Sequence, residues 1–333
     1  MKRRLALTLA ALLALGDSVP AFAYLKFGVP VRGQQVTVKW AQVPVRYAVS
    51  NVGVPGVSAA DFQAAVARAF ANWEAVPTAA VSYQFAGVTS AEPGSDDGNS
   101  VLGFRSRPDL DRVLASTSFL IDSATGALVE SDIFFNSAFP WSVAAAGESG
   151  RYDLESIALH EIGHFSGLGH SALGETELAG NGGRRVLAAE AVMFPIAYTS
   201  GSIAGRTLKA DDIAGISDLY PDGAFASTDG SLSGRVTKDG QPLFGAHVVA
   251  VNASTGAMVG GFTLNDQGQF SILGLSPGLH AVRVEPLDDA DVDSFFDGTH
   301  AVDLDFRVMF FDKVVVVPKG GDAGEIALKV TRK

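Results

Sequence analysis

The sequence predicts an α+β protein in which a mixed domain of sheet and helices precedes a small β-sandwich. The chain has 333 residues, and 47% of them are apolar, which is enough for two domains with sizeable cores. Its amino-terminal part combines apolar stripes at helical spacing with alternating strands, whereas residues 231–285 show only short alternating strands and turns. We therefore expect domains at 24–223 and 231–333, joined by a small polar linker at 224–230.

The first 23 residues are typical of a secretory signal peptide. Lys2-Arg3-Arg4 forms a basic start, an apolar run follows from Leu5 to Leu15, and Ala21-Phe22-Ala23 fits the small-x-small cleavage pattern. The mature chain is expected to begin at Tyr24 and to be exported, either secreted or periplasmic. The apolar run is too short to span a bilayer and no later segment is long enough, so we expect no membrane insertion.

Charge and cysteine content restrict the partners. The formal net charge is −11, which argues against nucleic acid and against anionic membrane surfaces. Cysteine is absent, so disulfides and thiolate metal ligands are excluded. Nothing in the sequence sets the oligomeric state.

Four strands are expected in the first domain, from alternating or continuous apolar residues between turn residues. They span 40–49, 81–85, 115–122 and 128–136. The polar loop 92–99 contains two adjacent aspartates and an asparagine and could hold Ca²⁺, although a solvated loop is the simpler interpretation.

Three main helices are expected in the same domain. Ser58 caps the first, which ends before Pro77, and Asp153 is placed to cap the second. The third stops at Tyr220-Pro221, because proline cannot continue a helix. Between the second and third helices, residues 171–185 are expected to form a glycine-rich excursion. The apolar stripes of the first and third helices are Phe62, Val66, Phe70 and Trp73, and Ile213, Ile216 and Leu219.

The second helix carries a motif that predicts a catalytic zinc site. His160 and His164 share one helical face, and His170 follows after Gly167, which can adopt the positive φ that ends a helix and redirects the chain. Three nitrogen ligands leave one tetrahedral position for water, as in catalytic zinc sites. Glu161, next to a ligand, is placed to act as the general base. The alternative is a set of ordinary histidines, since His-Glu-x-x-His also occurs in helices that bind nothing.

With Met193 about two dozen residues further on, the run from His160 to His170 resembles the metzincin zinc endopeptidases, whose pattern adds a methionine turn beneath the metal. More narrowly, it is similar to the matrixins, the matrix metalloproteinase branch, over roughly residues 38–221. The segments that carry this narrower resemblance are Ser166-Gly167-Leu168-Gly169-His170-Ser171, Val192-Met193-Phe194-Pro195, Leu208-Lys209-Ala210-Asp211-Asp212-Ile213-Ala214-Gly215-Ile216, and Trp40 leading into Val45-Arg46-Tyr47.

The resemblance implies a metzincin-type catalytic domain, a twisted mixed sheet with three main helices, that hydrolyses peptide bonds in proteins. It implies that His160, His164 and His170 bind one catalytic Zn²⁺, that Glu161 is the general base, and that Met193 forms the floor under the ligands.

The resemblance also implies where substrate binds. A peptide would add as a strand along residues 115–121, and residues 195–206 would wall the pocket for the side chain after the cut bond. Tyr198 could contact substrate there.

Three positions depart from the matrixin pattern. Ser116, Phe134 and Asn136 stand where matrixins place ligands of a structural zinc and of calcium. We therefore predict no structural zinc and leave Ca²⁺ open. Latency through a propeptide cysteine is excluded, because the chain has no cysteine.

The carboxyl-terminal part resembles the carboxypeptidase regulatory-like, transthyretin-like domain in segments 234–237, 240–248 and 268–278. His247, His280 and His300 are scattered there and are expected to be surface or strand histidines. Two other functions stay open: a surface or matrix-binding protein whose β-domain is the functional part, and a zinc hydrolase acting on non-peptide bonds.

Overall fold

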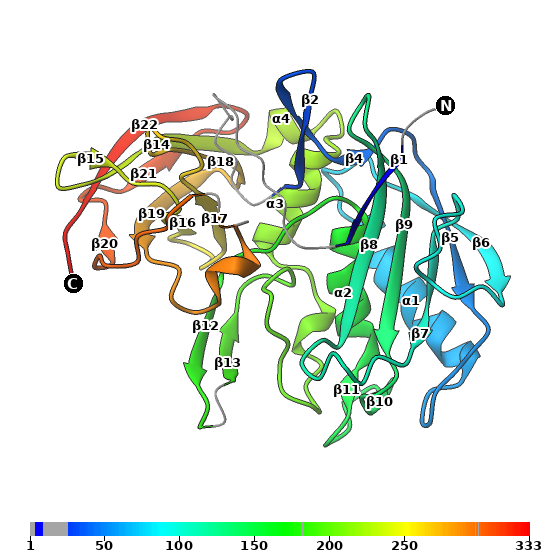
Figure 1. Cartoon of the computed structure of the whole chain (residues 1–333). Coiled ribbons are helices and arrows are strands. Elements are labelled where there is room, and N and C mark those ends of the chain that lie inside the picture. The colour runs from blue at the N-terminus through cyan, green and yellow to red at the C-terminus, as the bar shows by residue number, and fades with distance from the viewer. Residues whose placement is uncertain (1–3, 9–25, 181–182, 297, 299) are drawn as a thin grey trace.

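The structure, a computed structural model, describes residues 4–8, 26–180, 183–296, 298 and 300–333 (Figure 1). The predicted signal peptide lies outside the described residues except for Arg4–Thr8, which form strand β1. In the described part of the chain, no helix is both long enough and apolar enough to cross a membrane.

The amino-terminal part is built on a seven-stranded sheet in the order β1-β8-β9-β7-β5-β6, with β4 also paired to β9. Strand β8 runs antiparallel to β1 and β9, and the other pairs are parallel. The strand bounds are β4 Lys39–Trp40, β5 Val45–Ser50, β6 Tyr83–Thr89, β7 Val101–Arg105, β8 Ala115–Asp122 and β9 Ala127–Asn136.

The strand expected at 40–49 is divided in two. Trp40 ends β4, which pairs with β9, whereas β5 begins at Val45 between β6 and β7. Pro44 precedes β5 and has no amide hydrogen to donate to a ladder, so the break falls before Val45. The strand expected at 81–85 lies slightly later, as β6.

The three expected helices are present as α1 Ala59–Glu74, α2 Leu154–Phe165 and α3 Ala210–Leu219. The Ser58 and Asp153 side chains accept hydrogen bonds from the backbone at Asp61 and Ser156, so both predicted caps are confirmed. Helices α1 and α2 pack together behind the sheet (Figure 1). Trp73 Nε1 on α1 donates to the Leu159 carbonyl at 2.8 Å. Aromatic side chains at the centre of this core are fully buried, namely Phe62, Phe70, Trp73, Phe135, Trp141 and Phe165.

The sequence patterns did not predict several short elements. Residues 171–185, expected as an excursion, contribute to an antiparallel hairpin of β12 Gly174–Leu178 and β13 Arg184–Ala189. None of its strand residues is fully buried, and glutamates and arginines alternate with or precede the apolar residues, so no apolar alternation marks the hairpin. The remaining short elements are β2 Gly28–Val31, β3 Gln34–Thr37, β10 Trp141–Ser142, β11 Tyr152–Asp153 and η1 Ala204–Arg206.

The carboxyl-terminal part contains a four-stranded and a five-stranded sheet that bury apolar side chains in a common core. The residues expected as a linker include the one-turn helix α4 Phe225–Thr228. The first sheet consists of β14 Gly230–Lys238, β15 Gln241–Pro242, β18 Gln269–Leu275 and β22 Asp322–Val330. The second consists of β16 His247–Asn252, β17 Met258–Phe262, β19 Gly278–Glu285, β20 Met309–Phe310 and β21 Val315–Val317, and η2 Val292–Ser294 follows β19.

The two parts share buried contacts. Ala172 and Phe194 from the amino-terminal part join one apolar cluster with Phe262, Phe295 and other residues of the carboxyl-terminal part. The two parts therefore contact each other through buried apolar side chains. Ala172, in this contact, lies two residues after His170, where the histidine motif ends.

Candidate metal centre

The three motif histidines converge on one point. Nε2 of His164 lies 3.1 Å from Nε2 of His160 and 3.1 Å from Nε2 of His170. Two nitrogens bound to one Zn²⁺ at tetrahedral angles would lie about 3.3 Å apart. Among the described residues, these three are the group of His, Cys, Asp or Glu side chains whose ligand atoms are close enough to hold a metal ion. The spacing therefore fits a zinc site.

Each of these imidazoles is oriented by a backbone carbonyl. A carbonyl can only accept a hydrogen bond, so each Nδ1 carries the proton and each Nε2 keeps a lone pair for a metal. The accepting carbonyls are those of Val192 (2.7 Å from His160 Nδ1), Leu168 (2.8 Å from His164 Nδ1) and Ser294 (2.7 Å from His170 Nδ1).

Burial keeps the histidines neutral. It lowers the pKa of His160 to about 3, lowers the pKa of His164 well below its usual value, and also lowers that of His170. Neutral imidazole is the form that binds metal ions.

The turn that brings back His170 is a Schellman motif. Gly167 has a φ of 104°, and the amides of Gly167 and Leu168 donate to the carbonyls of His164 (2.9 Å) and Gly163 (3.0 Å). A Cβ at Gly167 would lie 2.4 Å from the Val38 carbonyl oxygen. The position therefore requires glycine both for its φ and for the close approach of another chain segment.

Side chains from distant elements satisfy the last carbonyls of α2. Trp40 Nε1 donates to the Phe165 carbonyl at 2.8 Å, and the Tyr220 hydroxyl donates to the Ser166 carbonyl at 2.7 Å. These bonds fix the helix end from which the turn departs.

Glu161 lies buried beside the three histidines. Its side chain accepts a hydrogen bond from the Thr117 hydroxyl at 2.7 Å. Burial raises the pKa of Glu161 to about 7, and the Thr117 hydrogen bond acts in the opposite direction. A cation held by the histidines would favour the ionised carboxylate further.

Met193 packs beneath α2. A Cβ at Gly163 would lie 2.2 Å from Met193 Sδ, so only glycine leaves room for this contact. Asp212 on α3 accepts hydrogen bonds from the amides of Val192 (2.8 Å) and Met193 (3.0 Å). The sequence patterns did not identify Gly163, Asp212 or Thr117 as parts of the site. Only Gly163 carried a local signal, because a glycine inside a helix often marks a close contact with another segment.

A cleft of about 350 Å³ runs from the histidines along α2 to Asp153. Residues 112–116 line one side, and a wall at 194–199 with Ser202 and Gly205 lines another. Tyr198 belongs to this wall. Its hydroxyl oxygen lies 3.1 Å from the Ala189 amide, which donates to it, and is thereby held on the β12–β13 hairpin.

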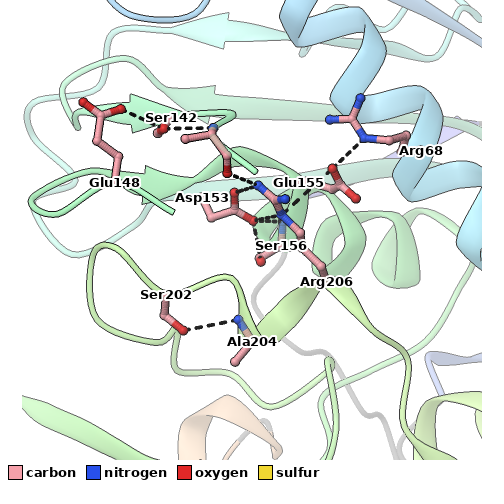
Figure 2. A network of polar contacts seen from close by, with 10 residues as sticks. Arg68, Ser142, Glu148, Asp153, Glu155, Ser156, Ser202, Ala204 and Arg206 are labelled. Carbon is pink, nitrogen blue, oxygen red and sulfur yellow. Dashed lines mark hydrogen bonds and ion pairs between the residues drawn. The ribbon is translucent and has the colours of Figure 1, made fainter. Parts of the chain in front are cut away.

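A polar network ties the far end of the wall to the start of α2 (Figure 2). Arg206 Nε donates to Asp153 Oδ2 at 2.9 Å, and the same oxygen accepts from the Ser156 amide. Two residues after Asp153, the Glu155 carboxylate accepts a hydrogen bond from Arg68 Nε of α1 at 2.7 Å. The wall, α1 and the histidine-bearing helix are thus held together by charged groups that no local pattern links.

The positions that depart from the matrixin pattern form polar and strand contacts. Asn136 Nδ2 donates to the carbonyls of Arg107 (2.8 Å), Leu110 and Val113, so an amide side chain holds this loop. Ser116 and Phe134 pair across β8 and β9. In the polar loop 92–99, the amides of Gly94 and Gly98 donate to Asp132 and Glu130 respectively.

Known proteins similar to this chain include metalloendoproteinases. Metalloendoproteinase 1 of Glycine max is 32% identical over 176 residues, which cover 48% of this chain and 45% of that protein. Matrix metalloproteinase-16 of Homo sapiens is 29% identical over 136 residues, covering 40% of this chain and 22% of that protein. The matched region thus spans less than half the length of either relative.

Among solved structures, the minor pilin GBS52 of Streptococcus agalactiae is similar over 32% of this chain and 45% of its own, at 13% identity and a TM-score of 0.21.

Family models match both parts of the chain. Residues 39–179 match the matrixin model, and residues 231–292 match the carboxypeptidase regulatory-like domain. The matrixin match contains the three converging histidines. The chain therefore contains a matrixin-like region and a carboxypeptidase regulatory-like domain.

Proposed function

We propose that this protein is an exported endopeptidase that uses one zinc ion and water to hydrolyse peptide bonds in proteins. The observation that carries the proposal is the convergence of three neutral histidines on one point, next to a buried carboxylate at the base of an open cleft. The proposal includes removal of residues 1–23 on export, and domains at 24–223 and 231–333 joined by 224–230.

His160, His164 and His170 would hold the zinc ion through Nε2. Zinc bound there would lower the pKa of water and polarise the scissile carbonyl. Glu161 takes a proton from the attacking water, whose oxygen forms the new bond to the carbonyl carbon. It then delivers that proton to the amine nitrogen as the C–N bond breaks, which yields an amine and a carboxylic acid that keeps the water's other hydrogen.

Substrate is proposed to add as a strand at the edge of β8. In the structure this edge already pairs with a backbone strand, since β1 runs antiparallel to it from Arg4 opposite Asp122 to Thr8 opposite Ser118. An edge that accepts β1 has the unpaired groups that a peptide substrate needs. Thr117, the next residue of β8, contacts Glu161, so a peptide in this register reaches the proposed base.

The wall of the cleft supports a preference for an apolar side chain just after the cut bond. Ile157, Val192, Pro195 and Ile196 line the cleft beside the histidines. Tyr198 lines it as well and remains our candidate for substrate contact.

The test is made on chains that begin at Tyr24. The parent chain should bind about one zinc ion and degrade an unstructured protein, because its ligands match a catalytic site. Glu161→Gln should retain zinc and lose about 10²–10⁴-fold in turnover, the usual contribution of a general base. Undiminished cleavage by this variant would overturn the mechanism. Cleavage of esters or glycosides without cleavage of any peptide in a library would identify a zinc hydrolase of another kind.

A further inference from the structure

We infer that the carboxyl-terminal domain completes the metal centre, with the Ser294 carbonyl as a positioning group for His170. The inference rests on the proposed binding of zinc by the three histidines. It gives the carboxypeptidase regulatory-like part of the chain a role in metal affinity.

The contact joins residues that lie 124 positions apart. Nδ1 of His170 donates to the Ser294 carbonyl at 2.7 Å, whereas the carbonyls that orient His160 and His164 belong to the amino-terminal part, at Val192 and Leu168. Neutral imidazole carries its proton on either nitrogen. A ring that loses its Nδ1 acceptor can move the proton to Nε2, where it blocks metal binding. The tautomer of this one ligand is therefore set by the other domain.

Apolar packing holds Ser294 in place. Phe295, the next residue, is 1% exposed, and its ring contacts His170 edge-on with centroids 6.3 Å apart. The same ring packs against Phe262 of β17 at 5.8 Å and shares a buried cluster with Phe194, the residue after Met193. Phe295 thus anchors the Ser294 carbonyl between the metal centre and the β-rich core.

Polar contacts hold the neighbouring segment 288–291 against the β12–β13 hairpin. The Thr176 amide donates to Asp289 Oδ1 at 2.7 Å, and its hydroxyl donates to the Asp289 carbonyl at 2.6 Å. Arg184 Nη1 donates to the Asp288 carbonyl at 2.8 Å. Since the hairpin follows His170 along the chain, these bonds keep the ligand and its acceptor in register.

A carboxyl-terminal domain that only stabilises the fold and one that positions His170 would respond differently to mutation. If the carboxyl-terminal part only stabilises the fold, any damage to its core should lower stability and leave the zinc affinity of the folded protein unchanged. If Ser294 positions His170, changes that displace this carbonyl should weaken zinc binding, and equally severe changes elsewhere in the domain should not.

The first experiment compares Phe295→Ala, Phe295→Leu and Phe270→Ala in the chain from Tyr24. Phe270 on β18 is equally buried, at 1% exposure, but lies in the other sheet and in another apolar cluster. Zinc affinity is measured by chelator competition at a temperature where each variant is folded, and Co²⁺ absorption reports the ligand geometry.

Phe295→Ala should weaken zinc affinity about 10–100-fold, the usual effect of losing an outer partner of a metal ligand, and should alter the Co²⁺ spectrum. Phe295→Leu should restore most of the affinity. Phe270→Ala should lower the melting temperature without changing the affinity. Parent-like affinity in folded Phe295→Ala, or an equal loss in Phe270→Ala, would overturn the inference.

A second experiment leaves every side chain intact, in case Phe295→Ala does not fold. Replacing Phe295 by its α-hydroxy acid analogue turns the Ser294 carbonyl into an ester carbonyl, a weaker acceptor, and removes an amide that donates to the Val292 carbonyl at 2.9 Å. The same replacement at Phe296 also removes an amide donor to the Val292 carbonyl, at 3.0 Å, but leaves the Ser294 carbonyl an amide. Only the ester at 295 should weaken zinc binding, and equal affinities for the two esters would contradict the inference.

These measurements need no substrate. If the parent chain binds no zinc, the proposed function itself is wrong. If the parent chain binds zinc and cleaves protein, and the Phe295 variants bind zinc equally well, only the inference about Ser294 is wrong.

Discussion

Thr117 Oγ1 lies 2.7 Å from Oε2 of Glu161 and 3.1 Å from the Glu161 backbone oxygen. Thr117 is fully buried on β8, the strand at whose edge we propose that substrate binds, and Glu161 is on α2 between two histidines. One hydroxyl thus connects the proposed base to the proposed substrate strand. A peptide that pairs with β8 would be placed in a defined relation to the carboxylate.

Thr117→Val should lower kcat/KM by at least about tenfold, because a hydrogen bond to a charged group contributes about 1.5–3 kcal/mol. Valine keeps the shape of the side chain and removes the donor, so bound zinc, measured by elemental analysis, should not change. Thr125→Val, in the exposed turn between β8 and β9, is the control and should leave kinetics unaltered. Full activity in Thr117→Val would show that the hydroxyl does not assist Glu161.

Gly163→Ala should lower the free energy of unfolding by about 1–3 kcal/mol, the cost of overpacking a core. At an open helical site the same change would stabilise by about 0.8–1 kcal/mol. Here the new Cβ would meet Met193 Sδ at 2.2 Å, and Met193 is buried and unable to move aside freely. Denaturant unfolding measures the effect. Gly223→Ala, which meets nothing within 4 Å, is the control, and equal stabilities of the two variants would contradict the clash.

Asp211 should make stability depend on pH. This carboxylate on α3 accepts a hydrogen bond from the Gly260 amide of the other domain at 2.8 Å, and burial raises its pKa to about 7. Because the folded pKa exceeds the unfolded value of about 3.9, the folded chain binds this proton more tightly. The stability that the proton contributes is complete below about pH 4 and is lost as the pH rises through 7.

Removing this titration by Asp211→Asn should therefore shift the melting temperature at pH 8, relative to its value at pH 4, upward compared with the parent, as measured by calorimetry. Asp212, whose pKa burial raises to about 6, contributes with the same sign and remains in the variant. The surface variant Asp239→Asn should keep the parent profile. Because the three buried histidines act with the opposite sign in parent and variant alike, only the difference between the two profiles reports on Asp211. Superimposable pH profiles of the parent and Asp211→Asn would contradict the assignment.

Retaining residues 1–23 should weaken activity on protein substrates, because β1 occupies the edge of β8. A chain from Met1 should show a KM severalfold above that of a chain from Tyr24, with equal zinc content. Ala6→Pro, which cannot donate to the ladder, should return the long chain towards the kinetics of the short one. Identical KM values for the long and short chains would exclude competition at this edge.

Local patterns were sufficient for much of this protein. Caps at Ser58 and Asp153 and apolar spacing predicted α1 and α2, and alternation predicted β8 and β9. The three histidines and the turn at Gly167 lie within one short segment, so helix geometry alone predicted that they would converge. The β12–β13 hairpin was missed because it shows no local apolar period. The division of 40–49 was missed because its apolar alternation continues across the break before Val45.

Tertiary structure alone decided which groups surround the histidine motif. Thr117 meets Glu161, and Asp212 holds the turn at Met193, only because separate elements pack together. The most distant partner in sequence is the Ser294 carbonyl, which accepts a hydrogen bond from His170 although the two residues lie 124 positions apart. Every residue carries a backbone carbonyl, so no side chain in the sequence marks this one as the partner of His170.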